Sequence, residues 1–228
     1  MKTDWPKNKI RGSTLFEVLI VISVLLLLAA VFLPALARPR RHPSGVSCVN
    51  DLKQVGLAFR VWEGDYGDKY PMSVSVTNGG TMELVESGVV WRHFQVMSNE
   101  LNTPKILFCP QDTDSKRKMA SIFGASMISG QIPFAGNSNT SYFVDVDATD
   151  MNPTMFLAGD RNLTLKGVAL SPGLHSLRTN ELMGWTRDLH VNQGNVLMTD
   201  GSVQAFSQRS LQTAWEQTGL ATNRLAVP

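Results

Sequence analysis

The chain has 228 residues, of which 43% are hydrophobic and 18% charged, with 18 Gly and 11 Pro. This composition is that of a folded protein and excludes an intrinsically disordered chain, and the length allows one medium domain with appendages or two small domains. The net charge of +2 is too small to indicate a nucleic-acid partner, and the sequence has no basic stripe with interleaved aromatic residues.

The first twelve residues form a short basic segment. Lys2, Lys7, Lys9 and Arg11 stand against a single acid, Asp4. The rest of the chain is close to neutral, so the positive charge belongs to this leader and not to the folded part.

An apolar stretch without charged residues runs from Val18 to Leu36. A helix needs about 20 such residues to cross the hydrocarbon core of a membrane, so the stretch predicts a transmembrane helix. Glu17 stands at its front edge, where a carboxylate is costly in lipid unless it has a functional partner.

The same stretch allows an alternative interpretation. A basic start, an apolar run and the small residues of Ala35-Leu36-Ala37 are typical of a secretory signal peptide. Signal peptidase would then cut after Ala37 and release a soluble exported protein, a β-rich binding or hydrolytic domain. The run is long for such a signal and Glu17 is awkward at its front, so we favour a retained helix.

The residues around Glu17 carry a more specific signal. Gly12, Thr14, Leu15 and Glu17 follow the basic leader at the spacing of a prepilin signal, and Pro34 stands where pilins commonly have a helix-kinking proline. In these positions the chain resembles the type IV pilins and the pseudopilins of type II secretion.

The resemblance implies that prepilin peptidase cuts between Gly12 and Ser13 and that the new amine of Ser13 is methylated. Ser13 departs from the family, whose first mature residue is usually Phe or Met. Glu17 would lie one helical turn away and pair with the terminal amine of a neighbouring subunit. The resemblance further implies a single-pass protein of the inner membrane with its head in the periplasm. It would assemble with other pilin-like subunits into a pilus or pseudopilus, as a filament or at the cell surface.

Beyond Pro39 and Pro43, which interrupt a helix, the sequence indicates an α+β head. Apolar residues at spacings of three and four predict a helix at 46–64, with Val49, Leu52, Val55, Phe59 and Trp62 on its buried face. Short apolar runs between turn residues predict strands at 89–94, 105–108, 141–146, 154–158, 195–199 and 202–206, and a closing helix at 210–218.

The predicted layout has five parts. They are a prepilin leader at 1–12, a transmembrane and assembly helix at 13–37, a basic hinge at 38–45, an amphipathic stem helix at 46–66 and a β-rich head at 70–228. The predicted fold is a pilin-like α+β arrangement in which the stem helix packs on a mainly antiparallel sheet.

Cys48 and Cys109 leave two interpretations open. Outside the cytosol they can form a disulfide that links the stem helix to the head, and otherwise they are two separate small apolar residues. The chain has no Cys-x-x-Cys pair, so the spacing gives no signal for a zinc site.

A second resemblance lies near the C-terminus. His190, followed after nine residues by Asp200-Gly201, resembles a signature of pilin-like proteins from planctomycetes and verrucomicrobia, whose role is not defined. His190 and Asp200 could form a metal or acid–base pair. An Asp-Gly pair between two strands, however, is explained by a tight turn alone, and we favour that structural interpretation.

Asp145, Asp147 and Asp150 form an acidic cluster that suggests a cofactor, with Asp160 after the next strand, and Asp65 and Asp68 form a second, weaker candidate. Clustered carboxylates suit Ca²⁺, but the spacing is not that of an EF-hand, and a solvated acidic loop is the preferred interpretation. Gly-x-Ser-x-Gly, Walker-type and His-Glu-x-x-His motifs are absent from the sequence, so we expect a structural protein and not an enzyme.

Overall fold

The computed structural model describes residues 15–36, 44–124 and 128–228. The chain divides into two compact units, Met1–Arg41 and His42–Pro228. The first contains helix α1, Leu15–Leu36, and the second contains all the other helices and strands that are described.

Helix α1 is apolar on all sides. Its large side chains are exposed around the whole circumference, from Leu15 at 85% and Phe16 at 72% to Leu26 at 66% and Leu27 at 68%. Glu17 is the acidic residue of the first turn. The helix therefore has no polar face that would mark one side as turned to water.

The transmembrane prediction is not supported. In the described part of the chain, no helix is both long and apolar enough to cross a membrane. The predicted transmembrane helix at 13–37, and with it the single-pass location in the inner membrane with a periplasmic head, is therefore wrong.

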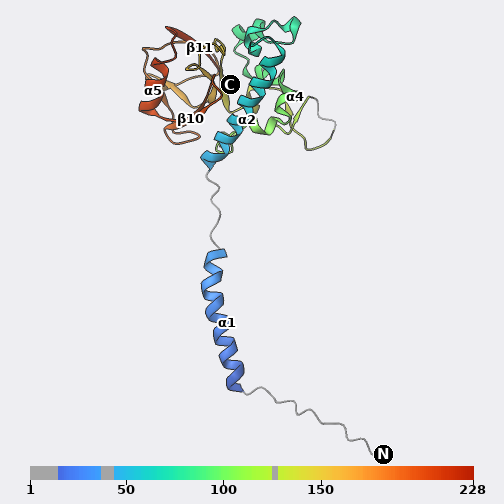
Figure 1. Cartoon of the computed structure of the whole chain (residues 1–228), viewed down its shortest axis with the longest axis vertical. Helices are drawn as coiled ribbons and strands as arrows, with labels where there is room; N and C mark the ends of the chain where they lie inside the picture. Colours follow the sequence, from blue (N-terminus) through green and yellow to red (C-terminus); the bar gives the residue numbers. More distant parts are fainter. Residues whose placement is uncertain (1–14, 37–43, 125–127) are drawn as a thin grey trace, which may run out of the picture. The chain divides into compact units, whose positions relative to one another are not determined.

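The second unit is an α+β fold built on a large antiparallel sheet (Figure 1). The strand order is β10-β9-β4-β3-β11-β7. The strands are β3 Tyr142–Asp145, β4 Phe156–Asp160, β7 Gly173–Arg178, β9 Gln193–Met198, β10 Val203–Ser207 and β11 Thr222–Val227. Every pairing within this sheet is antiparallel.

Helix α2, Ser44–Asp65, packs on one face of this sheet. Leu52, Val55 and Phe59 are fully buried there with Leu197 of β9, as their spacing predicts. The helix comes close to the sheet at Gly56, where a Cβ would lie 2.7 Å from Leu197 Cδ1. Short helices and turns complete this layer: η1 Pro71–Ser73, η2 Val76–Asn78, η3 Met82–Ser87, α3 Val90–Gln95, α4 Ser98–Leu101, η4 Pro104–Leu107 and η5 Asn137–Asn139.

The opposite face carries a second apolar core. Successive residues of a strand point to opposite faces, so Val196 and Met198 of β9 pack with Trp215 of helix α5, Gln208–Glu216, while Leu197 faces α2. A three-stranded sheet, β6-β5-β8, joins this core with strands β5 Leu163–Leu165, β6 Val168–Ala169 and β8 Met183–Trp185. The large sheet is thus the middle of three layers, with α2 and α5 on opposite sides (Figure 1).

The structure corrects two predicted strands. The run at 89–94 forms helix α3, and the run at 105–108 is mostly the 3-10 helix η4. Pro104 stands in the first turn of η4, where proline is favoured because its fixed φ suits a helix start. The other four predicted strands correspond to β3, β4, β9 and β10, and the closing helix to α5. A short parallel pair, β1 Ile122–Phe123 with β2 Pro133–Phe134, was not predicted.

Candidate functional site

The two cysteines, whose pairing the sequence left open, form a disulfide. Cys48 lies in α2 and Cys109 follows η4, with their Cα atoms 5.3 Å apart. Both side chains are fully buried. The bond ties the first turns of α2 to the head.

His190 packs against this disulfide from the loop between β8 and β9. Its Nε2 atom lies 3.5 Å from Cys109 Sγ, 3.2 Å from Asn195 Nδ2 and 3.2 Å from Asp160 Oδ2. The side chain of His190 is 9% exposed. One imidazole nitrogen thus faces a sulfur, an amide and a carboxylate together.

Asp160 is the acidic partner of His190. It ends β4 and is completely buried, and its Oδ2 accepts hydrogen bonds from Asn195 N at 2.6 Å and Asn195 Nδ2 at 2.9 Å. Antiparallel pairing of β4 with β9 brings these two residues together. The other carboxylate oxygen, Oδ1, is buried without a hydrogen-bond partner in the described part of the chain.

The loop that carries His190 has an uncommon backbone. Leu189, Val191 and Asn192 have φ values of 56°, 51° and 60°. For a β-branched residue such as Val191 the left-handed region is a clear outlier, and such conformations persist only where the surrounding structure imposes them. The fold therefore holds His190 in place at a conformational cost.

The structure does not join His190 to Asp200. The two residues lie beyond opposite ends of β9, and its six residues at about 3.3 Å per residue separate them by roughly 20 Å. Asp200 instead accepts a hydrogen bond from Ser202 N at 2.8 Å in the β9–β10 turn, where Gly201 has a φ of 83°. Asp200-Gly201 thus forms a structural turn, which is the interpretation favoured from the sequence.

The predicted calcium ligands also have separate roles. Asp145 is completely buried and accepts Asp147 N at 3.0 Å, and burial raises its pKa well above the ordinary value, which favours the uncharged acid. Asp147 binds Arg224 through Nη2 at 2.7 Å, and Asp150 pairs with Arg60. Within the described residues these carboxylates form no group that could hold a metal ion.

A polar cleft of about 400 Å³ lies next to the His190 loop, lined by Asp112, Asp114, Arg161, Asp188 and Leu189 among others. Burial alone would raise the pKa of Asp112, but hydrogen bonds from Arg161 and Ser141 and the charge of Arg117 hold it below the usual value. Burial, helped by the charge of Arg161, lowers the pKa of Arg117 to about 10. The charges at this cleft pair with one another, which gives it a structural role.

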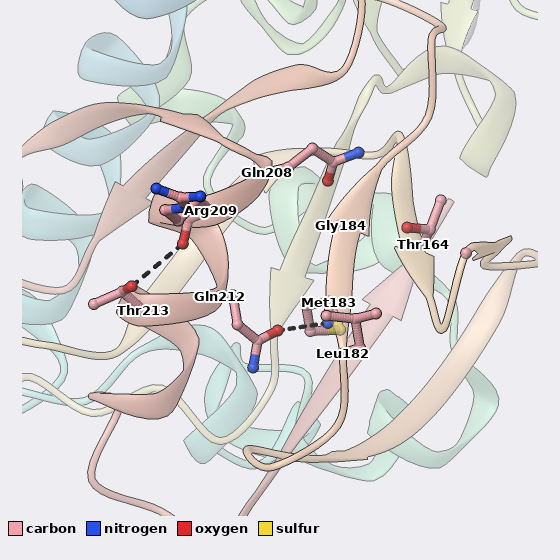
Figure 2. A pocket seen from close by; sticks show the side chains of 9 residues that line it. Thr164, Leu182, Met183, Gly184, Gln208, Arg209, Gln212 and Thr213 are labelled. Atoms are coloured by element: carbon pink, nitrogen blue, oxygen red, sulfur yellow. Dashed lines mark hydrogen bonds between the residues drawn. The ribbon is translucent and has the colours of Figure 1, made fainter.

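A larger groove of about 590 Å³ separates α5 from the small sheet (Figure 2). Figure 2 shows Gln212 of α5 reaching β8, where its Oε1 accepts Met183 N at 2.8 Å. Gln208 accepts Trp185 N at 2.7 Å and donates to Trp185 O at 2.9 Å. Arg209 and Thr164 complete a lining of amide, guanidinium and hydroxyl groups.

The residues of the predicted processing signal are only partly described. Gly12, Ser13 and Thr14 lie outside the described residues, while Leu15 and Glu17 lie in the first turn of α1. Pro34 lies within α1, near its C-terminal end. Cleavage and methylation therefore stay predictions.

Sequence reasoning missed Asn195, and it noticed Asp160 only as an outlying acid of the calcium cluster. Nothing local in the sequence links these residues to His190, because strand pairing makes the contact. No known protein family, curated protein or solved structure matches the chain.

Proposed function

We propose that this chain is a structural subunit that assembles into a filament of the pilus or pseudopilus type through helix α1. The observation that carries the proposal is the exposure of apolar side chains on all sides of α1, including Leu19 at 59% and Leu25 at 59%. A helix that is apolar all round is stable only when it is covered. Copies of the same helix, packed side by side, cover one another on every side.

The apolar area is large enough to drive assembly. Burying a Leu, Val or Phe side chain contributes about 1.5–3 kcal/mol. The free energy gained by covering about six such residues therefore exceeds the roughly 8 kcal/mol of a micromolar association. The entropy lost on association has still to be subtracted from it. Large side chains exposed by about half or more run from Leu15 to Leu28.

In this proposal Glu17 sets the register between the α1 helices of neighbouring chains. It is the sole ionisable residue of α1, so within a bundle of such helices its carboxylate is drawn out of water. A buried carboxylate needs a cationic partner, and cleavage after Gly12 by a prepilin peptidase would create one, the amine of Ser13 on a neighbouring chain. The head has its own two apolar cores and does not need α1 to fold.

The test is assembly of the full chain co-expressed with a prepilin peptidase. We expect an intact mass that begins at methylated Ser13, and polymers that sediment and appear as filaments by electron microscopy. Glu17→Ala should abolish the polymers. Ser23→Ala, in the same helix, changes only a hydroxyl that bonds to Ile20 O at 2.8 Å and should leave assembly unchanged.

Wild-type polymer yield from Glu17→Ala would refute the register pairing. A mature chain that begins near Arg38 would instead support the alternative, an exported binding domain released after Ala37. The groove beside α5 is the feature that favours this alternative, because the guanidinium of Arg209 and the hydroxyl of Thr164 line it together with apolar side chains such as Leu182.

A further inference from the structure

Three metal-binding side chains meet where α2 joins the head. Cys48, Cys109 and His190 each offer a ligand atom, and these atoms lie within 4.8 Å of one another. They come from α2, from the segment after η4 and from the loop before β9. In the described ranges no other group of three or more such side chains comes together.

The distance between His190 and Cys109 matches that of a tetrahedral zinc site. Zinc binds sulfur at about 2.3 Å and imidazole nitrogen at about 2.0–2.1 Å, so tetrahedral geometry places sulfur about 3.5 Å from nitrogen. The structure has His190 Nε2 3.5 Å from Cys109 Sγ.

Asp160 and Asn195 hold His190 beside the cysteines. Asp160 is completely buried, and its Oδ2 atom lies 3.2 Å from His190 Nε2 and accepts two hydrogen bonds from Asn195. Carboxylates and amides that orient a metal-binding histidine are common behind zinc ligands.

We infer that the disulfide and a zinc ion are alternative occupants of this site. A dithiol reductant supplies two electrons and two protons, which convert the Cys48–Cys109 disulfide into two thiols while the dithiol becomes a disulfide. Zn²⁺ then displaces the two thiol protons and binds both thiolates and His190, and a water molecule takes the fourth position. The sulfurs part to about 3.8 Å, the sulfur–sulfur edge of the zinc tetrahedron.

Zinc suits this ligand set better than calcium or magnesium. Thiolate and imidazole ligands select zinc among the abundant divalent ions, whereas calcium and magnesium take oxygen ligands. Either occupant, disulfide or zinc, keeps α2 tied to the segment that follows η4, so the stem stays attached in oxidising and in reducing surroundings.

The experiment uses the full chain, reduced with a dithiol that is then removed by gel filtration under nitrogen, and titrated with Co²⁺ as a spectroscopic substitute for Zn²⁺. We expect one Co²⁺ per chain, with visible bands of tetrahedral cobalt and near-ultraviolet thiolate-to-cobalt charge transfer. The oxidised chain should show neither. His190→Ala should weaken binding by more than about 100-fold and Asn195→Ala by about 10–100-fold.

His175→Ala is the matched control, because His175 is a histidine away from the site whose ring bonds to Ser171 O at 2.7 Å. It should bind cobalt like the wild type. Cobalt binding by His190→Ala at wild-type affinity would reduce the site to two adventitious thiols and overturn the inference.

The melting temperature of the reduced chain is a second measurement, which tests the inference even if reduction destabilises the fold. Zn²⁺ should raise the melting temperature of the reduced wild type and of His175→Ala, but not that of His190→Ala. A reduced wild-type chain whose melting temperature is the same with Zn²⁺ and with a chelator would overturn the inference.

Discussion

Arg161 holds Asp112 with two parallel hydrogen bonds, from Nε to Oδ2 at 2.8 Å and from Nη2 to Oδ1 at 2.6 Å. The Asp112 side chain is fully buried, and Ser141 adds a third hydrogen bond at 2.8 Å. Bidentate pairs of this kind are among the stronger polar interactions in proteins. They link the segment after Cys109 to the end of β4.

Asp112→Asn should lower the free energy of unfolding by about 3 kcal/mol, because it removes the buried charge that Arg161 binds at 2.6 Å and leaves Arg161 only the more distant Asp114, at 3.7 Å. Urea unfolding at pH 7 measures this. Glu181→Gln, which breaks the exposed Lys166–Glu181 pair at 3.0 Å, is the control and should change the free energy of unfolding far less, because exposed ion pairs contribute little. Equal losses in the two variants would contradict the structural role of Asp112.

The carboxylate of Asp112 should also make the stability of the chain fall in acid. Its pKa is lowered in the folded chain from 3.8, so the stability it contributes is complete above about pH 4 and is lost as the pH falls through the lowered value. In Asp112→Asn the free energy of unfolding should therefore fall less on acidification than in the wild type.

His93 should make stability depend on pH in a higher range. It is buried, its Nδ1 lies 2.7 Å from Thr81 Oγ1, and burial lowers its pKa from 6.5 to about 4. The unfolded chain therefore takes up this proton between pH 6.5 and 4 while the folded chain does not. Stability is complete above pH 6.5 and falls toward pH 4 by roughly 3 kcal/mol, at about 1.4 kcal/mol per pKa unit.

Urea unfolding of the wild type and of His93→Asn across this range checks the effect, because asparagine keeps a hydrogen bond to Thr81 but does not titrate. Burial raises the pKa of Asp51 to about 6, which contributes stability below pH 3.8 that is lost as the pH rises through 6. This opposite trend is common to both chains and cancels in the difference. Parallel stability curves for the two chains would exclude the His93 effect.

Loss of the disulfide should destabilise the oxidised chain. Cys48 and Cys109 are 61 residues apart, and closing a loop of that length in the unfolded chain contributes about 4 kcal/mol. The double variant Cys48→Ser/Cys109→Ser should lose this amount in chelator-treated buffer. A reductant should lower the denaturation midpoint of the wild type but leave that of the double variant unchanged.

Two glycines of α2 should respond to alanine with opposite signs. At Gly56 a Cβ would lie 2.7 Å from Leu197 Cδ1, whereas at Gly64 nothing lies within 4 Å. Overpacking costs about 1–3 kcal/mol and alanine gains about 1 kcal/mol over glycine in a helix. Gly56→Ala should therefore be neutral to destabilising by about 2 kcal/mol, and Gly64→Ala stabilising by up to about 1 kcal/mol. Thermal melts measure both, and stabilisation by Gly56→Ala would contradict the close packing of α2 on β9.

Elements with a clear local pattern could be predicted from the sequence. The spacing of Leu52, Val55 and Phe59 indicates α2, and Asp200-Gly201 marks the hairpin of β9 and β10. The short apolar run of α3 resembles a strand because periodicity cannot separate a buried helical turn from a strand. Strand β11 was missed because its first half, Thr222 to Arg224, is polar and hides the short apolar run that follows.

The candidate site could be predicted from the sequence less well than the fold. The sequence indicates a possible pair of cysteines and, separately, His190, but the meeting of all three depends on α2 lying on the sheet and on β4 pairing with β9. The contact between Asp160 and His190 is of this kind, and no spacing in the sequence encodes it. Asp147 and Asp150 show the converse. They are neighbours in sequence, but Asp147 pairs with Arg224 and Asp150 pairs with Arg60, in different parts of the fold.

The side chain of Gln208 blocks one edge of the small sheet. Its amide accepts from the N–H and donates to the carbonyl of Trp185, as the backbone of one more strand would do. An exposed strand edge is a template for pairing with other chains, and here a side chain occupies that template. The small sheet thus ends at β8 on a glutamine, so in the proposed filament neighbouring heads would not pair edge to edge at this strand.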